Sequence, residues 1–233
     1  MRPPLRLVLP AASALLALVL VLAILLDGSS KGSSSDSSRA TVSQPNTGFD
    51  GAALPAGSRA PAFTLPDQRG QSVSLSAYRG RVLVLVFLSS SCRSCVLVAQ
   101  QVRGALDELA GPGSTPRGGS GSPVPAVRTL FVSTNPKADT HASVGRFLTE
   151  TSLNGRVEYL TGDPAGLQPV WHAYGIAPAS AGKAASQAPT AVSEAPTSVL
   201  LIDRDGNERV EFGLEQLTPE SLAHDIRILR AEA

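Results

Sequence analysis

The chain has 233 residues, a formal net charge of +1 and only 4% aromatic residues. No basic block or acidic tail is present, which excludes the electrostatic pattern of a nucleic-acid-binding protein. With so few aromatic residues, the core is expected to consist mainly of Val, Leu, Ala and Ile, as in an α/β domain with apolar parallel strands.

The N-terminal segment is predicted to anchor the chain in a membrane. Residues 1–6 contain Arg2 and Arg6, and residues 7–26 form an apolar run of about 20 residues, long enough to cross a bilayer. The arginines would stay in the cytoplasm, so the rest of this single-pass cell-membrane protein would lie outside. The alternative is a cleaved signal peptide with a weak cleavage site at Gly28-Ser-Ser30. Both interpretations place the C-terminal domain in an extracytoplasmic compartment.

The next segment, residues 27–53, is predicted to be a disordered linker. It is rich in Ser and Gly and has too few apolar groups to offset the entropy of ordering. Residues 54–233, roughly 180 in number, suit one domain with a full hydrophobic core.

Within residues 54–233, strands and helices are expected to alternate. The expected strands are residues 62–65, 72–75, 81–88, 127–132, 157–160, 198–202 and 209–212. The expected helices are residues 95–110, a segment capped by Asp139 or Thr140 and ending near 151, a segment from Asp163-Pro164 to about 175, and residues 217–231. Segments 111–125 and 177–192 are expected to be loops rich in small residues. This order predicts an α/β sandwich around a mixed sheet.

The two cysteines of the chain, Cys92 and Cys95, lie where the apolar strand turns into a helix. Unpaired N–H groups at a helix start and the helix dipole favour a thiolate on Cys92, and Arg93 adds a positive charge beside it. Because the spacing lets one sulfur reach the other, we predict Cys92 as the attacking thiol and Cys95 as the resolving thiol. The alternative, a structural disulfide, would gain little stability from so small a loop.

A second signal is Pro196, which directly precedes the strand expected at residues 198–202. A cis Ala195–Pro196 bond would expose unpaired backbone groups of Ala195 to a substrate chain. The alternative is an ordinary trans proline at the end of a loop.

Several stretches resemble extracytoplasmic thioredoxin-like proteins of the TlpA and ResA type. They are Pro61-Ala-Phe-Thr-Leu-Pro-Asp-Gln68, Val73-Ser-Leu-Ser-Ala-Tyr-Arg-Gly80, the strand leading to Cys92-Arg-Ser-Cys95, and Ala195-Pro-Thr-Ser-Val-Leu-Leu-Ile-Asp-Arg-Asp-Gly206. The resemblance implies a thioredoxin-like fold and a thiol–disulfide oxidoreductase without an organic cofactor. Its partners would be protein thiols and disulfides, and a membrane redox partner that resets the cysteine pair. In that family the proline matching Pro196 is cis and packs against the dithiol, whereas Ser91 stands where the family commonly has Trp.

The middle of the chain also resembles the SCO/SenC copper chaperones for cytochrome oxidase assembly. The matching stretches are Val132-Ser-Thr-Asn-Pro-Lys-Ala-Asp-Thr140, Val157-Glu-Tyr-Leu-Thr-Gly-Asp-Pro164 and Val170-Trp-His-Ala-Tyr-Gly-Ile176. This resemblance implies an alternative function, in which Cys92 and Cys95 hold copper(I), a metal that prefers soft thiolates. That family, however, has three residues between its cysteines, and its histidine ligand aligns with Ala195 and Pro196.

The chain's three histidines, His141, His172 and His224, are each predicted to be surface or half-buried residues rather than ligands. No metal site is therefore assigned in the main interpretation. A thiol peroxidase is a further alternative, since Ser89 suits one position that precedes a peroxiredoxin cysteine. Leu85, however, stands where those proteins have proline.

Overall fold

The computed structural model describes residues 48–110, 127–178 and 197–232. The predicted membrane anchor and most of the predicted linker lie outside these ranges. So do the predicted loop 111–125, residues 179–192 of the second predicted loop, and Ala195 and Pro196. Among the helices in the described ranges, none is both long and apolar enough to cross a membrane.

The domain is built on a six-stranded mixed sheet in the order β1-β8-β7-β4-β5-β6. Its strands are β1 (Ala52–Ala53), β4 (Val82–Leu88), β5 (Val127–Ser133), β6 (Glu158–Leu160), β7 (Ser198–Ile202) and β8 (Glu208–Phe212). β4 pairs in parallel with β5, and β5 in parallel with β6, whereas β7 runs antiparallel to both β4 and β8. A separate antiparallel hairpin joins β2 (Thr64–Pro66) to β3 (Ser72–Ser74). The predicted mixed sheet is confirmed.

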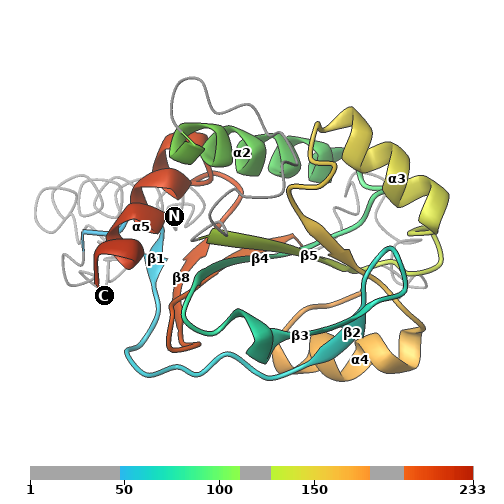
Figure 1. The fold of residues 1–233 in the computed structure, drawn as a ribbon, viewed down its shortest axis with the longest axis horizontal. Coiled ribbons are helices and arrows are strands. Elements are labelled where there is room, and N and C mark those ends of the chain that lie inside the picture. Colours follow the sequence, from blue (N-terminus) through green and yellow to red (C-terminus); the bar gives the residue numbers. More distant parts are fainter. Residues whose placement is uncertain (1–47, 111–126, 179–196, 233) are drawn as a thin grey trace, which may run out of the picture. The chain divides into compact units, whose positions relative to one another are not determined.

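Helices cover both faces of this sheet, as Figure 1 shows. They are the 3-10 helix η1 (Leu75–Tyr78), α2 (Arg93–Ala110), α3 (His141–Glu150), α4 (Pro164–Ala173) and α5 (Pro219–Ala231). One hydrophobic cluster joins a face of the sheet to α2, α3 and α5, and a second cluster joins the other face to α4, η1 and the β2–β3 hairpin.

Strand β4 contributes residues to both clusters, and all seven of its residues are buried. Successive strand side chains point to opposite faces, so Val84 and Val86 pack under α2 while Leu85 and Phe87 pack toward α4. A strand buried on both faces needs an uninterrupted apolar sequence, which is why this run was recognisable from the sequence. Its central place fixes the residues that follow Leu88.

The start of the domain differs from the sequence expectation. Ala52 and Ala53, placed in the linker, form β1 and pair with β8, so the ordered domain begins earlier than residue 54. The buried carboxylate of Asp225 on α5 accepts the backbone N–H groups of Asp50 and Gly51, which fixes the approach to β1. An Ala-Ala pair has no strand pattern of its own, so this strand depends on tertiary contacts.

The helix boundaries also sharpen two expectations. α2 begins at Arg93, two residues before the predicted start, so Cys95 lies within its first turn. Thr140, and not Asp139, is the N-cap of α3, because its hydroxyl accepts the N–H of Ser143. Asp139 has another environment, described below.

Candidate functional site

The cysteine pair lies at the carboxyl end of β4, across the first turn of α2. Cys92 and Cys95 form a disulfide with their Cα atoms 5.2 Å apart. Cys95 is fully buried, with 0% of its surface exposed, whereas Cys92 is partly exposed. The two cysteines therefore differ in access: an external molecule can reach Cys92 more readily than Cys95.

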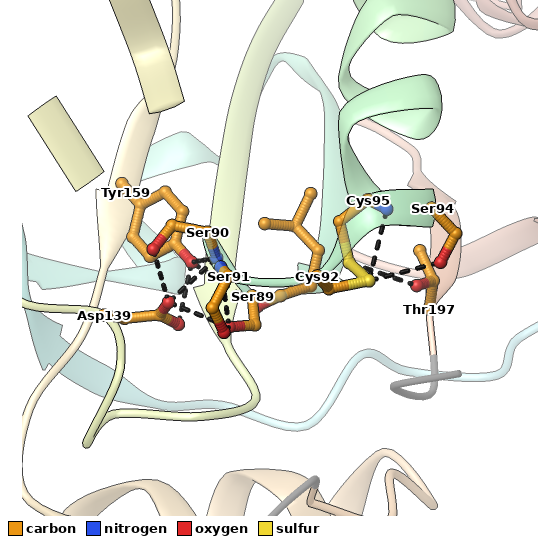
Figure 2. The surroundings of a disulfide bond; sticks show 10 residues. Ser89, Ser90, Ser91, Cys92, Ser94, Cys95, Asp139, Tyr159 and Thr197 are labelled. Atoms are coloured by element: carbon orange, nitrogen blue, oxygen red, sulfur yellow. Dashed lines mark hydrogen bonds between the residues drawn. A yellow bond between two sulfur atoms is a disulfide. The ribbon is translucent and has the colours of Figure 1, made fainter. Parts of the chain in front are cut away.

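Hydrogen-bond donors surround the sulfur of Cys92. The backbone N–H of Cys95 donates to the Cys92 Sγ at 3.2 Å, and the hydroxyl of Ser94 lies 3.2 Å from the same sulfur (Figure 2). The positive end of the α2 dipole acts at the same place. Arg93, the predicted tuning residue, is exposed, so water screens its charge. The helix start is therefore the main local source of thiolate stabilisation.

The serine turn, residues 89–91, connects β4 to Cys92 and is held by one buried side chain, Asp139. The carboxylate of Asp139 is 2% exposed and accepts five hydrogen bonds. The donors are the hydroxyls of Ser89, Ser90, Ser133 and Tyr159 and the backbone N–H of Ser90, at 2.6 to 2.9 Å. Figure 2 shows Ser89, Ser90 and Tyr159 around the carboxylate, on the side of the serine turn away from the sulfur atoms.

Tyr159 on β6 takes part in this cluster as a neutral donor. Burial, followed by the charge and hydrogen bond of Asp139, raises the pKa of its hydroxyl well above the usual value. Asp139 and Tyr159 were not predicted as site residues. The only local signals were three consecutive serines before Cys92 and an aspartate in the stretch that resembles the SCO proteins.

The predicted substrate-binding residues Ala195 and Pro196 lie outside the described residues. Thr197, which follows them directly, is described, and its Oγ1 lies 3.7 Å from the Cys95 Sγ. β7 then begins at Ser198, which pairs with Phe87 near the end of β4. The chain therefore reaches the buried sulfur immediately after Pro196, while the conformation at Pro196 stays a prediction.

The histidines do not join the cysteine pair to form a metal site. His141 pairs through Nδ1 with the carbonyl of Gln68 at 2.7 Å, and His224 pairs through Nε2 with the carbonyl of Gly48 at 3.0 Å. His172 is exposed on α4.

In the described ranges, three potential metal ligands lie close together: Asp50, His224 and Asp225. Both carboxylate oxygens of Asp225 are already used by backbone N–H groups, and neither cysteine belongs to this group. Since the sequence holds no other Cys or His and its one Met is Met1, the described residues supply no soft or imidazole third ligand at the cysteine pair. They do not fit the copper(I) site that the SCO resemblance implies.

Solved structures with the same fold include both copper proteins and redox proteins. The Bradyrhizobium japonicum ScoI structure with copper bound is 24% identical, with a TM-score of 0.51, and the match covers 74% of this chain and 99% of that one. Yeast Sco1 is 16% identical with a TM-score of 0.57, over 75% of this chain and 99% of its own. The thioredoxin domain of a thiol-disulfide oxidoreductase from Bacteroides vulgatus is 17% identical with a TM-score of 0.50, over 75% and 97%. These similarities show a thioredoxin-like fold.

A shorter similarity connects the chain to Mycobacterium tuberculosis proteins. Over 57 residues, 24% of this chain, it is 44% identical to a protein of strain H37Rv that is named provisionally as a peroxiredoxin. A protein of strain CDC 1551 matches equally. The match spans 36% of each relative, about a third of its length.

The family comparison covers most of the chain. The SCO1/SenC family matches residues 52–230, which include every helix and strand described above except the last residue of α5. The family match therefore extends well beyond the middle of the chain, where the sequence resembles the SCO proteins. The chain belongs to the SCO1/SenC family.

Proposed function

We propose that this SCO1/SenC-family domain is a thiol–disulfide oxidoreductase that exchanges disulfides with protein substrates through Cys92 and Cys95. The observation that carries the proposal is the disulfide across the first turn of α2, between a partly exposed Cys92 and a fully buried Cys95. A pair of this kind opens and closes without moving the backbone.

In the reduced protein, the Cys92 thiolate attacks one sulfur of a substrate disulfide and releases the other substrate sulfur as a thiolate. A mixed disulfide between Cys92 and the substrate remains. The thiolate of Cys95 then attacks the Cys92 sulfur, releases the second substrate thiol and closes the Cys92–Cys95 disulfide. Two electrons pass to the substrate, and the reverse sequence oxidises a substrate dithiol.

The different exposure of the two cysteines supports these roles. The sulfur of the partly exposed Cys92 accepts the N–H of Cys95, a contact that stabilises negative charge when Cys92 leaves or attacks. The buried Cys95 is shielded from external disulfides, so its partner is the Cys92 sulfur one turn away. This arrangement favours intramolecular resolution of the mixed disulfide.

The remaining parts of the proposal concern location and partners. Residues 7–26 would anchor the domain to the cell membrane from outside, and a membrane redox partner would reset the cysteine pair. The backbone of Ala195, next to Pro196, would pair with the substrate chain. The contact of Thr197 with Cys95 supports this last point, since it brings the end of that segment to the redox pair.

Copper(I) delivery is the second candidate function, and the SCO1/SenC family membership favours it. It would need a third ligand that the described residues do not bring to the cysteines. The two functions therefore predict different results for the same purified protein.

The test uses the full-length chain in mild detergent. Wild-type protein is expected to reduce a protein disulfide such as that of insulin, Cys92→Ser to lose this activity, and Cys95→Ser to accumulate a mixed disulfide through Cys92. Copper(I) affinity is measured in parallel by chelator competition, with His141→Ala, His172→Ala and His224→Ala variants. Tight one-to-one copper binding that depends on a histidine, together with no disulfide exchange, would replace the oxidoreductase proposal with the copper function.

A further inference from the structure

We propose that Asp139 is a positioning residue for the redox pair, whose buried carboxylate fixes the turn before Cys92 and whose negative charge disfavours the Cys92 thiolate. The inference rests on the proposed redox function and adds a residue that sets its equilibrium.

The first part of the argument is the anchoring of the turn. One oxygen of the carboxylate, Oδ1, accepts the hydroxyl of Ser89 at 2.9 Å, the N–H of Ser90 at 2.8 Å and the hydroxyl of Ser90 at 2.7 Å. The backbone N–H of Cys92 in turn donates to the carbonyl of Ser89 at 3.2 Å. The position of Cys92 is thus tied to Asp139 through a single short turn.

The second part is the charge. All five donors to the carboxylate are neutral, and no Lys, Arg or His of the described segments forms an ion pair with it. In a buried site of low effective dielectric, an uncompensated charge acts strongly on its neighbours. The group that gains negative charge during disulfide exchange is the sulfur of Cys92, which directly follows the serine turn that this carboxylate holds.

The other ionisable groups near the cluster do not cancel this effect. Tyr159 is neutral, because its pKa lies well above the usual value. His141, at the start of α3, pairs with the carbonyl of Gln68, and Arg93 on α2 is exposed to water. The helix dipole of α2 stabilises the Cys92 thiolate, whereas the negative charge of Asp139 destabilises it.

An asparagine can replace Asp139 while keeping most of the framework. The second carboxylate oxygen, Oδ2, accepts the hydroxyls of Ser133 at 2.6 Å and Tyr159 at 2.8 Å. Hydroxyls also accept hydrogen bonds, so an amide NH₂ at this place can donate to both. The Tyr159 hydroxyl can then donate to the carbonyl of Leu88, which lies 3.5 Å away. Asp139→Asn thus removes the charge with little loss of shape.

The experiment compares full-length wild type with Asp139→Asn. Two quantities are measured: the pH profile of Cys92 alkylation in the reduced protein, and the equilibrium of the cysteine pair with glutathione at pH 8. We expect Asp139→Asn to move the alkylation profile to lower pH. We also expect it to shift the equilibrium about tenfold toward the dithiol, which is a potential about 30 mV less negative.

Two control variants separate charge from loosening. Asp203→Asn also removes one carboxylate charge, but near the other end of β4, and it is expected to change neither measurement. Ser133→Ala removes one hydrogen bond to Asp139 but keeps the charge, so its shift must be much smaller than that of Asp139→Asn. Equal shifts in Ser133→Ala and Asp139→Asn would overturn the charge effect and leave only loosening of the turn.

The outcomes also separate this inference from the proposed function. A wild-type pair that does not equilibrate with glutathione overturns the proposed function and the inference with it. A wild-type pair that equilibrates, with Asp139→Asn unchanged, overturns the inference alone. If Asp139→Asn does not fold, Ser143→Lys adds a cation beside Ser90, whose hydroxyl lies 3.3 Å from that of Ser143, and must shift both measurements in the same direction.

Discussion

Two aspartates near opposite ends of the central strand β4 have different hydrogen-bond and ion-pair partners. Asp203 follows the last residue of β7, which pairs with Leu83 near the start of β4, whereas Asp139 lies beside the turn after the end of β4. Asp203 accepts backbone N–H groups within its own hairpin turn and also pairs with Arg209 at 3.3 Å. Asp139 is bound only by neutral donors in the described part of the chain.

The pKa of Asp203 reflects its charged and polar partners. Burial acts to raise the pKa of Asp203, but hydrogen bonds from Asn207 and the hydrogen bond and charge of Arg209 outweigh it and lower the pKa. Arg209 also pairs with Glu232 at 2.6 Å, so charges of both signs balance there. A carboxylate that serves only a turn is compensated by a cation. The uncompensated one holds the turn that leads to Cys92.

The largest expected effect on stability comes from Asp139→Ala. Four hydroxyls and one N–H would lose a common acceptor in a site that is almost closed to water, and unsatisfied buried donors are costly. We expect the free energy of unfolding to fall by about 3 to 5 kcal/mol. Urea denaturation of the full-length chain measures it. A loss below about 1 kcal/mol would show that the cluster does not hold the serine turn.

The regions around Asp203 and Asp139 also show which features the sequence could and could not predict. The apolar run of β4 and the Cys92–Cys95 spacing are local patterns, so the central strand, the helix that follows it and the close approach of the two cysteines were predictable. The turn Asp203-Arg-Asp-Gly206 was equally predictable, because its chemistry is contained in four residues.

Asp139 was not predictable as a site residue. Aspartate before a helix ordinarily acts as a cap, and that was the interpretation its sequence supported. Its real partners come from the end of β4, the end of β5 and β6, between 6 and 50 residues away in sequence. Only the parallel arrangement of these strands brings their ends together. β1 was missed for a related reason, since its pairing with β8 depends on a register that two alanines do not encode.

A smaller effect is expected from Tyr159→Phe, which removes one hydroxyl of the cluster. The substitution removes the 2.8 Å hydrogen bond to Asp139 and an acceptor 3.1 Å from the N–H of Ser90, which Asp139 still accepts, and keeps the ring that packs against Phe131 and Phe147. We expect a loss of about 1 to 2 kcal/mol in the free energy of unfolding, from one charge-assisted hydrogen bond. Urea denaturation measures this loss. Stability equal to that of wild type would mean that the remaining four donors satisfy the carboxylate.

The smallest effect is a pH dependence at the Asp203 end. Because folding lowers the pKa of Asp203 from 3.8, its ionised form stabilises the folded chain above that pH, and this contribution disappears as the pH falls through the folded value. The difference in unfolding free energy between wild type and Asp203→Asn should therefore be constant above about pH 5 and shrink below about pH 4. Urea denaturation from pH 3 to pH 7 measures it. A difference that stays constant through the acid range would mean that Arg209 and the turn bind the neutral carboxyl as well as the carboxylate, and the contrast with Asp139 would then rest on burial alone.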